Sequence, residues 1–195
     1  MFHTNWKKEF LTIPNLLSLF RLALIPVYMT LYRNAATGRD YLLAGAVLTL
    51  SCLTDMADGY IARRFHMVST VGKVLDPLAD KATQFTLTLC LSMKYPVLGP
   101  VLILFVIKEI FQLLAMLISF RHGKVLPGAL PSGKICTLVL FSSLIGMVLF
   151  PNLSQSLVNS IALTDAVFLM LSFVCYILAY VGKYAKITDI HPKET

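Results

Sequence analysis

Two short acidic segments, DMADGYIAR at residues 55–63 and GKVLDPLAD at residues 72–80, stand between long apolar stretches of this sequence. They hold four of the chain's ten acidic residues, namely Asp55, Asp58, Asp76 and Asp80. Aspartates three or four residues apart share one face of a helix. Two neighbouring helices can therefore direct four carboxylates toward one point, where bound divalent cations would compensate their charge.

The composition indicates a membrane protein. Hydrophobic residues make up 57% of the 195 residues, and charged residues only 14%, whereas soluble domains are usually about a quarter charged. The sequence therefore predicts an all-α integral membrane protein with six transmembrane helices. The net charge of +7 favours an anionic membrane surface or phosphorylated ligands. Nucleic acid is a poor match, because the basic residues are dispersed around apolar segments.

The apolar segments define the predicted domain organisation. We expect an amphipathic interfacial segment at residues 1–13, a six-helix transmembrane domain at residues 14–186 and a cytoplasmic tail at residues 187–195. The alternative for the first segment is a disordered tail. The six spans are predicted at residues 14–31, 41–64, 71–93, 96–120, 132–150 and 165–182.

The first span also has the length of a signal-peptide core at residues 22–32. The apolar sequence extends backwards through residues 16–20, however, so we expect a retained helix. Basic residues predict its orientation, because Arg33, Arg39 and Lys94 fall on one side of the membrane and the other basic residues at span ends fall on the opposite side. This bias places both termini and the acidic segments in the cytoplasm.

The spacing of the acidic segments resembles the signature of the CDP-alcohol phosphotransferase family. That signature reads D, two residues, DG, two residues, AR, eight residues, G, three residues, D, three residues, D. Every fixed position and every gap is matched, by Asp55, Asp58, Gly59, Ala62, Arg63, Gly72, Asp76 and Asp80. The alternative is a set of buried structural ion pairs, but acids within a membrane are functional by default.

The resemblance implies a phosphatidyltransferase that uses CDP-diacylglycerol and releases CMP. Its metal ligands would be Asp55, Asp58, Asp76 and Asp80, holding two divalent cations, Mg²⁺ or Mn²⁺, and Asp80 would also be the catalytic general base. The CDP portion would be bound by Asp55, Gly59, Ala62, Arg63 and Gly72. The resemblance also implies a homodimer in the bacterial cell membrane, with the active site facing the cytoplasm.

In many family members the first span opens with a similar polar segment, here Pro14, Asn15, Ser18 and Arg21. One interpretation makes these residues a wall of the nucleotide pocket. The other makes them a helix cap followed by an arginine that extends to the membrane surface. The sequence leaves both open.

The acceptor alcohol is predicted from a second basic set, Lys108, Arg121 and Lys134. Gly133, Lys134 and Thr137 resemble the start of the fifth helix in phosphatidylglycerophosphate synthases, which favours glycerol-3-phosphate as the acceptor. Lys108 stands where those enzymes usually have arginine, and residues 114–117 lack their second arginine. Phosphatidylglycerol, the acceptor of cardiolipin synthases of the same fold, is therefore the alternative.

Simpler interpretations exist for these lysines and for the whole chain. Lys108 can pair locally with Glu109, and Lys134 can simply mark the cytoplasmic side. Intramembrane acids also suit a transporter or proton relay, and a lipid-binding partner without catalysis is a third class. The glycine and arginine spacing around the aspartates favours a phosphate site over these alternatives.

Overall fold

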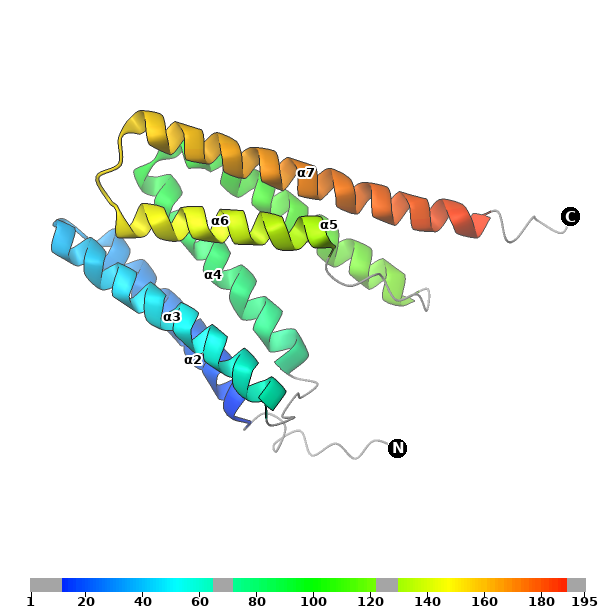
Figure 1. The fold of residues 1–195 in the computed structure, drawn as a ribbon, viewed down its shortest axis with the longest axis horizontal. Helices are drawn as coiled ribbons and strands as arrows, with labels where there is room; N and C mark the ends of the chain where they lie inside the picture. The colour runs from blue at the N-terminus through cyan, green and yellow to red at the C-terminus, as the bar shows by residue number, and fades with distance from the viewer. Residues whose placement is uncertain (1–11, 65–71, 122–129, 189–195) are drawn as a thin grey trace, which may run out of the picture. The chain divides into compact units, whose positions relative to one another are not determined.

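The computed structural model of the protein describes residues 12–64, 72–121 and 130–188, and no strand occurs within these ranges (Figure 1). The predicted all-α fold with six long helices is confirmed. In chain order, the elements are α2 (Ile13–Arg33), α3 (Gly38–Arg64), α4 (Gly72–Lys94), the short 3₁₀ helix η1 (Pro96–Leu98), α5 (Gly99–Arg121), α6 (Pro131–Leu149) and α7 (Gln155–Thr188).

One predicted boundary was wrong at the last helix. The sixth span was expected to begin at Asp165, but α7 begins at Gln155 and places Asp165 in its interior. The polar side chain suggested a helix start, yet it is buried and lies against Ser143 of α6. The helix continues to Thr188, and its apolar stretch ends at Tyr180, close to the predicted span end at residue 182. The predicted interfacial segment lies mostly outside the described residues.

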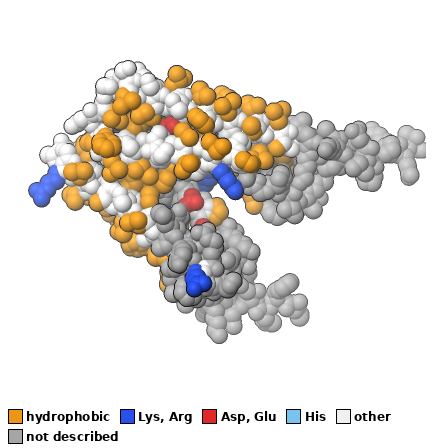
Figure 2. Space-filling view, viewed as in Figure 1, with side chains coloured by type: hydrophobic (Ala, Val, Ile, Leu, Met, Phe, Trp, Pro, Cys, Tyr) orange, Lys and Arg blue, Asp and Glu red, His pale blue; other side chains and the backbone are white. Residues whose placement is uncertain are grey.

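The helices have the length and the surface of a multi-pass membrane protein. Four apolar stretches are long enough to cross a membrane: Asn15–Arg33, Pro96–Ile118, Pro131–Leu149 and Gln155–Tyr180. The remaining long helices, α3 and α4, have 27 and 23 residues and carry the acidic segments. Large apolar side chains such as Leu138 and Leu163 are exposed, at 71% and 68%. Figure 2 shows such hydrophobic side chains spread over the surface of α6 and α7. Such exposed apolar surfaces are suited to contact with the lipid hydrocarbon of a membrane.

The described helices form two compact units, of which the first comprises Met1–Lys94 and Leu144–Leu153. In this unit α2 packs against both α3 and α4 (Figure 1). Gly45 of α3 allows close packing, because a Cβ atom there would lie 3.1 Å from Leu149 Cδ2. At the end of α4, Lys94 Nζ donates a hydrogen bond to the Pro151 carbonyl at 3.0 Å and lies 3.9 Å from the centre of the Tyr41 ring.

A capping box fixes the start of α3. The Asp40 carboxylate accepts hydrogen bonds from the Thr37 backbone N–H at 2.8 Å, the Ala36 N–H at 3.0 Å and the Thr37 hydroxyl at 2.8 Å. These donors lower the pKa of Asp40, the Thr37 backbone N–H contributing most. The short connection from α2 is therefore closed by local hydrogen bonds.

The second unit comprises Tyr95–Ser143 and Ser154–Thr195. Here α5 packs against α7. The Phe111 ring meets the rings of Phe173 and Tyr180 edge to face, with centroid distances of 5.3 and 6.1 Å. Ser143 Oγ of α6 lies 2.7 Å from Asp165 Oδ2 of α7. Aromatic packing and polar contacts between helices thus hold this unit together.

Candidate functional site

The signature residues lie on α3 and α4. The final turns of α3 carry Asp55, Asp58, Gly59, Ala62 and Arg63, whose side chains are outside the described part of the structure. Gly72 is the first residue of α4 and is buried, and Asp76 and Asp80 follow on the same helix. Their spacing of four residues places the two carboxylates on one face of α4.

Both aspartates of α4 meet polar side chains of α2. The Ser18 hydroxyl donates a hydrogen bond to Asp76 Oδ1 at 2.5 Å. The Arg21 guanidinium forms an ion pair with Asp80 through Nη1 and Oδ1. Arg21 is only 2% exposed, whereas 47% of the Asp80 side chain remains exposed. Asp80 is thus held by Arg21 while part of its side chain remains exposed.

The structure contradicts one interpretation of the first span's polar residues, the arginine that extends to the membrane surface. Arg21 does not extend to the membrane surface, because its side chain is buried against α4. Asn15 and Ser18 are also buried, at 1% and 0% exposure. The sequence did not predict that α2 supplies the partners of Asp76 and Asp80. The signal was the three-residue spacing of Asn15, Ser18 and Arg21, which puts all three on one side of the helix.

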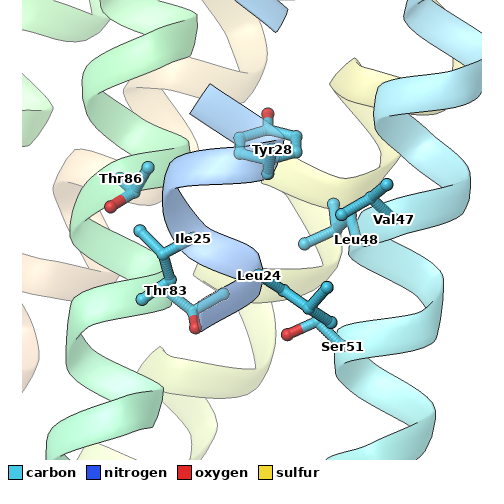
Figure 3. A pocket seen from close by; sticks show the side chains of 8 residues that line it. All are labelled: Leu24, Ile25, Tyr28, Val47, Leu48, Ser51, Thr83 and Thr86. Carbon is cyan, nitrogen blue, oxygen red and sulfur yellow. The ribbon is translucent and has the colours of Figure 1, made fainter. Parts of the chain in front are cut away.

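A small cavity lies one helical turn farther along the three helices (Figure 3). It has a volume of about 10 Å³, room for about one water molecule. Ser51, Thr83 and Thr86 line it beside apolar side chains such as Leu24 and Leu48. Thr83 follows Asp80 by three residues, and Ser51 precedes Asp55 by four. At that level the described side chains of α2, α3 and α4 enclose only this small cavity.

The donor set suits a hard divalent cation. Asp76 and Asp80 offer only carboxylate oxygens, the ligands preferred by Mg²⁺ and Mn²⁺. Among the described side chains no group of three or more metal-ligating residues forms. Two of the four signature carboxylates, Asp55 and Asp58, lie outside that described set. The two carboxylates that are described face the same helix and fit the predicted ligand chemistry.

The predicted acceptor residues lie in the second unit. Lys108 of α5 is 2% exposed, and its Nζ donates hydrogen bonds to Glu109 Oε1 and Gln112 Oε1, both at 2.8 Å. The predicted local pair with Glu109 is thus confirmed. Lys134 is exposed on the first turn of α6. Arg121 is the last residue of α5, and its side chain is outside the described residues.

Comparison with known proteins agrees with this arrangement. The family described as CDP-alcohol phosphatidyltransferase matches residues 11–181. A CDP-diacylglycerol–glycerol-3-phosphate 3-phosphatidyltransferase of Aquifex aeolicus is 30% identical over 86% of this chain and 95% of its own length. A protein of the same name from Rickettsia bellii is 44% identical over 35% of this chain and 38% of its own length.

A relative with a different name matches as well. A cardiolipin synthase (CMP-forming) of Streptomyces coelicolor is 34% identical over 65% of this chain and 60% of its own length. The chain spans less than half the length of several curated relatives that it matches. The family match nevertheless covers every helix from α2 to most of α7. With Asp76 and Asp80 on one face of α4 and a complete signature on α3 and α4, the chain belongs to the CDP-alcohol phosphatidyltransferase family.

Proposed function

We propose that the protein transfers the phosphatidyl group of CDP-diacylglycerol to glycerol-3-phosphate and releases CMP. The observation that carries this proposal is the pair Asp76 and Asp80, held on one face of α4 by Ser18 and Arg21 of α2. Family membership supplies the reaction class. The names of the Aquifex and Rickettsia relatives supply the favoured acceptor.

The signature carboxylates would hold the metal ions. Asp55, Asp58, Asp76 and Asp80 are proposed to bind two divalent cations, Mg²⁺ or Mn²⁺. Bound there, the cations would neutralise the charge of the diphosphate. The oxygen-only donor set and the shared face of Asp76 and Asp80 support this assignment.

The CDP portion is proposed to lie against the end of α3 and the start of α4. Gly59, Ala62 and Gly72 are small, so the nucleotide can approach the backbone beside them. Arg63 would bind phosphate oxygens with its planar guanidinium group. Asp55 would contribute to the same subsite.

Asp80 is proposed to be the general base. It would accept the proton of the acceptor hydroxyl as the oxygen forms a bond to the lipid-side phosphorus. The bond from that phosphorus to CMP breaks, and CMP leaves with the electron pair. Arg21 engages one oxygen of Asp80 and the side chain remains 47% exposed. An exposed carboxylate with a fixed orientation suits this role.

The acceptor phosphate is proposed to bind Lys108, Arg121 and Lys134. A dianionic phosphate needs nearby cations, and lysine serves as a point charge. The active site would face the cytoplasm, where the soluble products leave, and the protein would form a homodimer. The positive charge at the predicted cytoplasmic span ends supports this orientation.

One observation favours a second candidate, cardiolipin synthesis with phosphatidylglycerol as the acceptor. Lys108 already donates to Glu109 and Gln112, so less of its charge is available to a dianion. A phosphodiester with one negative charge needs less compensation. The Streptomyces relative carries the corresponding name.

An acceptor panel with purified protein tests the two candidates. CDP-diacylglycerol is supplied with Mg²⁺ or Mn²⁺ and with glycerol-3-phosphate or phosphatidylglycerol, and the lipid product is identified. We expect phosphatidylglycerophosphate and CMP. Cardiolipin as the product, with glycerol-3-phosphate ignored, would replace the first candidate by the second.

A substitution tests the acceptor residues. Lys134→Ala is expected to raise the KM for glycerol-3-phosphate by roughly 10- to 150-fold, the value of a lost charged hydrogen bond. The KM for CDP-diacylglycerol should change little. Lys186→Ala near the end of α7 is the matched control. Equal changes in both KM values would remove Lys134 from the acceptor site.

A further inference from the structure

Tyr176 of α7 contacts the start of α6 through its hydroxyl group. The hydroxyl oxygen accepts a hydrogen bond from the Leu130 N–H at 3.2 Å. Gly133 is buried beside the ring, and a Cβ atom there would lie 2.6 Å from Tyr176 Oη and 2.9 Å from Cε2. A side chain at position 133 would therefore displace the tyrosine or the first turn of α6.

The same ring faces Lys108 of α5. The Lys108 Nζ atom lies 5.8 Å from the ring centre, within the range of a cation–π interaction. Hydrogen bonds to Glu109 and Gln112 hold that ammonium group in place. Tyr176 thus touches both segments that carry the proposed acceptor lysines, because Lys134 directly follows Gly133.

We infer that Tyr176 is a positioning residue for the acceptor phosphate, and this inference rests on the proposed function. Its hydroxyl fixes the start of α6, and with it Lys134, relative to the ammonium group of Lys108 beneath its ring. Gly133 makes room for the tyrosine. Fixing two cations before the ligand arrives lowers the cost of binding it.

The KM values of the two substrates distinguish a positioning role of Tyr176 from a purely structural one. A tyrosine that only held α6 against α7 would, when altered, lower the melting temperature and affect both substrates alike. A positioning residue acts on one substrate, so the KM for the acceptor should respond while the KM for CDP-diacylglycerol does not.

The first test is Tyr176→Phe in the full-length protein. Removing the hydroxyl leaves the ring beside Lys108 but frees the Leu130 N–H. We expect the KM for glycerol-3-phosphate to rise roughly 2- to 12-fold, the value of one neutral hydrogen bond. The KM for CDP-diacylglycerol should stay unchanged, and the melting temperature should fall only slightly. Tyr28→Phe on α2 is the control, because the hydroxyl of Tyr28 has no hydrogen-bond partner among the described residues, and it should leave both KM values unchanged.

The second test pairs Gly133→Ala with Tyr176→Phe. Gly133→Ala alone should raise the KM for glycerol-3-phosphate more than Tyr176→Phe does, because the added methyl group meets the hydroxyl oxygen at 2.6 Å. Removing that oxygen relieves the closest contact. The double variant should therefore lose less affinity for the acceptor than the sum of the single losses.

The possible outcomes test the role of Tyr176 separately from the proposed function. If wild-type protein uses glycerol-3-phosphate and Tyr176→Phe changes both KM values equally or neither of them, the inference is overturned and the function stands. Additive losses in the double variant also count against it. If wild-type protein does not use glycerol-3-phosphate, the proposed function fails and the inference fails with it.

Discussion

Asp80 is the residue on which the proposed chemistry depends most directly. Asp80→Asn keeps the shape of the side chain and a carbonyl oxygen that can accept a hydrogen bond from Arg21, although the ion pair is lost. Turnover should fall by about 10²–10⁴-fold, the usual loss for a general base. CMP release measures the effect, and Asp165→Asn is the matched control. Activity within threefold of wild type would remove Asp80 from the base role.

A second residue-scale prediction concerns Asp165, which lies within the apolar stretch Gln155–Tyr180 of α7. The Ser143 hydroxyl oxygen lies 2.8 Å from the Leu140 carbonyl and 2.7 Å from Asp165 Oδ2. One hydroxyl has one proton to donate, so both contacts are satisfied when Ser143 donates to Leu140 and Asp165 carries the proton for the other. A neutral acid also costs less within a membrane.

Asp165→Asn should therefore preserve stability, because an amide N–H₂ group donates to Ser143 as the neutral acid would. Asp165→Ala should lower the free energy of unfolding by about 1–3 kcal/mol. Thermal unfolding in detergent gives the comparison. Equal destabilisation by both substitutions would show that the carboxyl group is ionised.

At the scale of the element, the start of α3 depends on Asp40. Hydrogen bonds from Thr37 and Ala36 lower its pKa, so the folded protein binds the proton less readily than the unfolded chain does. Its contribution to stability is present above the pKa of the unfolded chain, about 3.9. It is lost as the pH falls through the lower pKa of the folded state.

Asp40→Ala should accordingly lower the melting temperature at neutral pH by a small amount. The difference from wild type should shrink as the solution is acidified below about pH 4. Melting curves of both proteins over this pH range provide the measurement. A difference independent of pH would mean that the carboxylate charge does not stabilise the capping box.

The sequence predicted a helix correctly where an apolar stretch was bounded by helix-breaking residues. The third span was predicted at residues 71–93 and α4 runs from Gly72 to Lys94. The start of the last helix was predicted wrongly, because a lone aspartate such as Asp165 usually marks the end of an apolar span. Its contact with Ser143 is what allows Asp165 to be buried inside α7. Local patterns do not reveal a partner on another helix.

In the candidate site, too, the sequence predicted the local spacing of residues but not their partners on another helix. The four-residue spacing predicted that Asp76 and Asp80 share a face, and the structure agrees. Their partners Ser18 and Arg21 precede them by 58 and 59 residues. Such pairings depend on how α2 packs against α4, which the signature does not encode. The alternative of an arginine extending to the surface was equally consistent with the sequence.

At the scale of the whole molecule, activity should require a divalent cation. Convergent carboxylates repel one another without one. EDTA should abolish CMP release, and added Mg²⁺ or Mn²⁺ should restore it. Ca²⁺ provides a control for size and geometry, because it prefers more ligands at longer distances. Full activity in metal-stripped protein would contradict the proposed metal site.

The ion pair between Arg21 and Asp80 also constrains how the chain is made. Translation adds about 5–20 residues per second, so the ribosome needs roughly 3–12 s to advance the 59 residues from one partner to the other. During that interval we expect α2 to enter the bilayer before Asp80, the counter-ion of Arg21, has been synthesised. Nascent chains stalled before α4 should therefore be extracted from membranes by alkali more readily than chains that include Asp80. The final packing against α4, which supplies Asp80, explains why a membrane helix can carry a buried arginine.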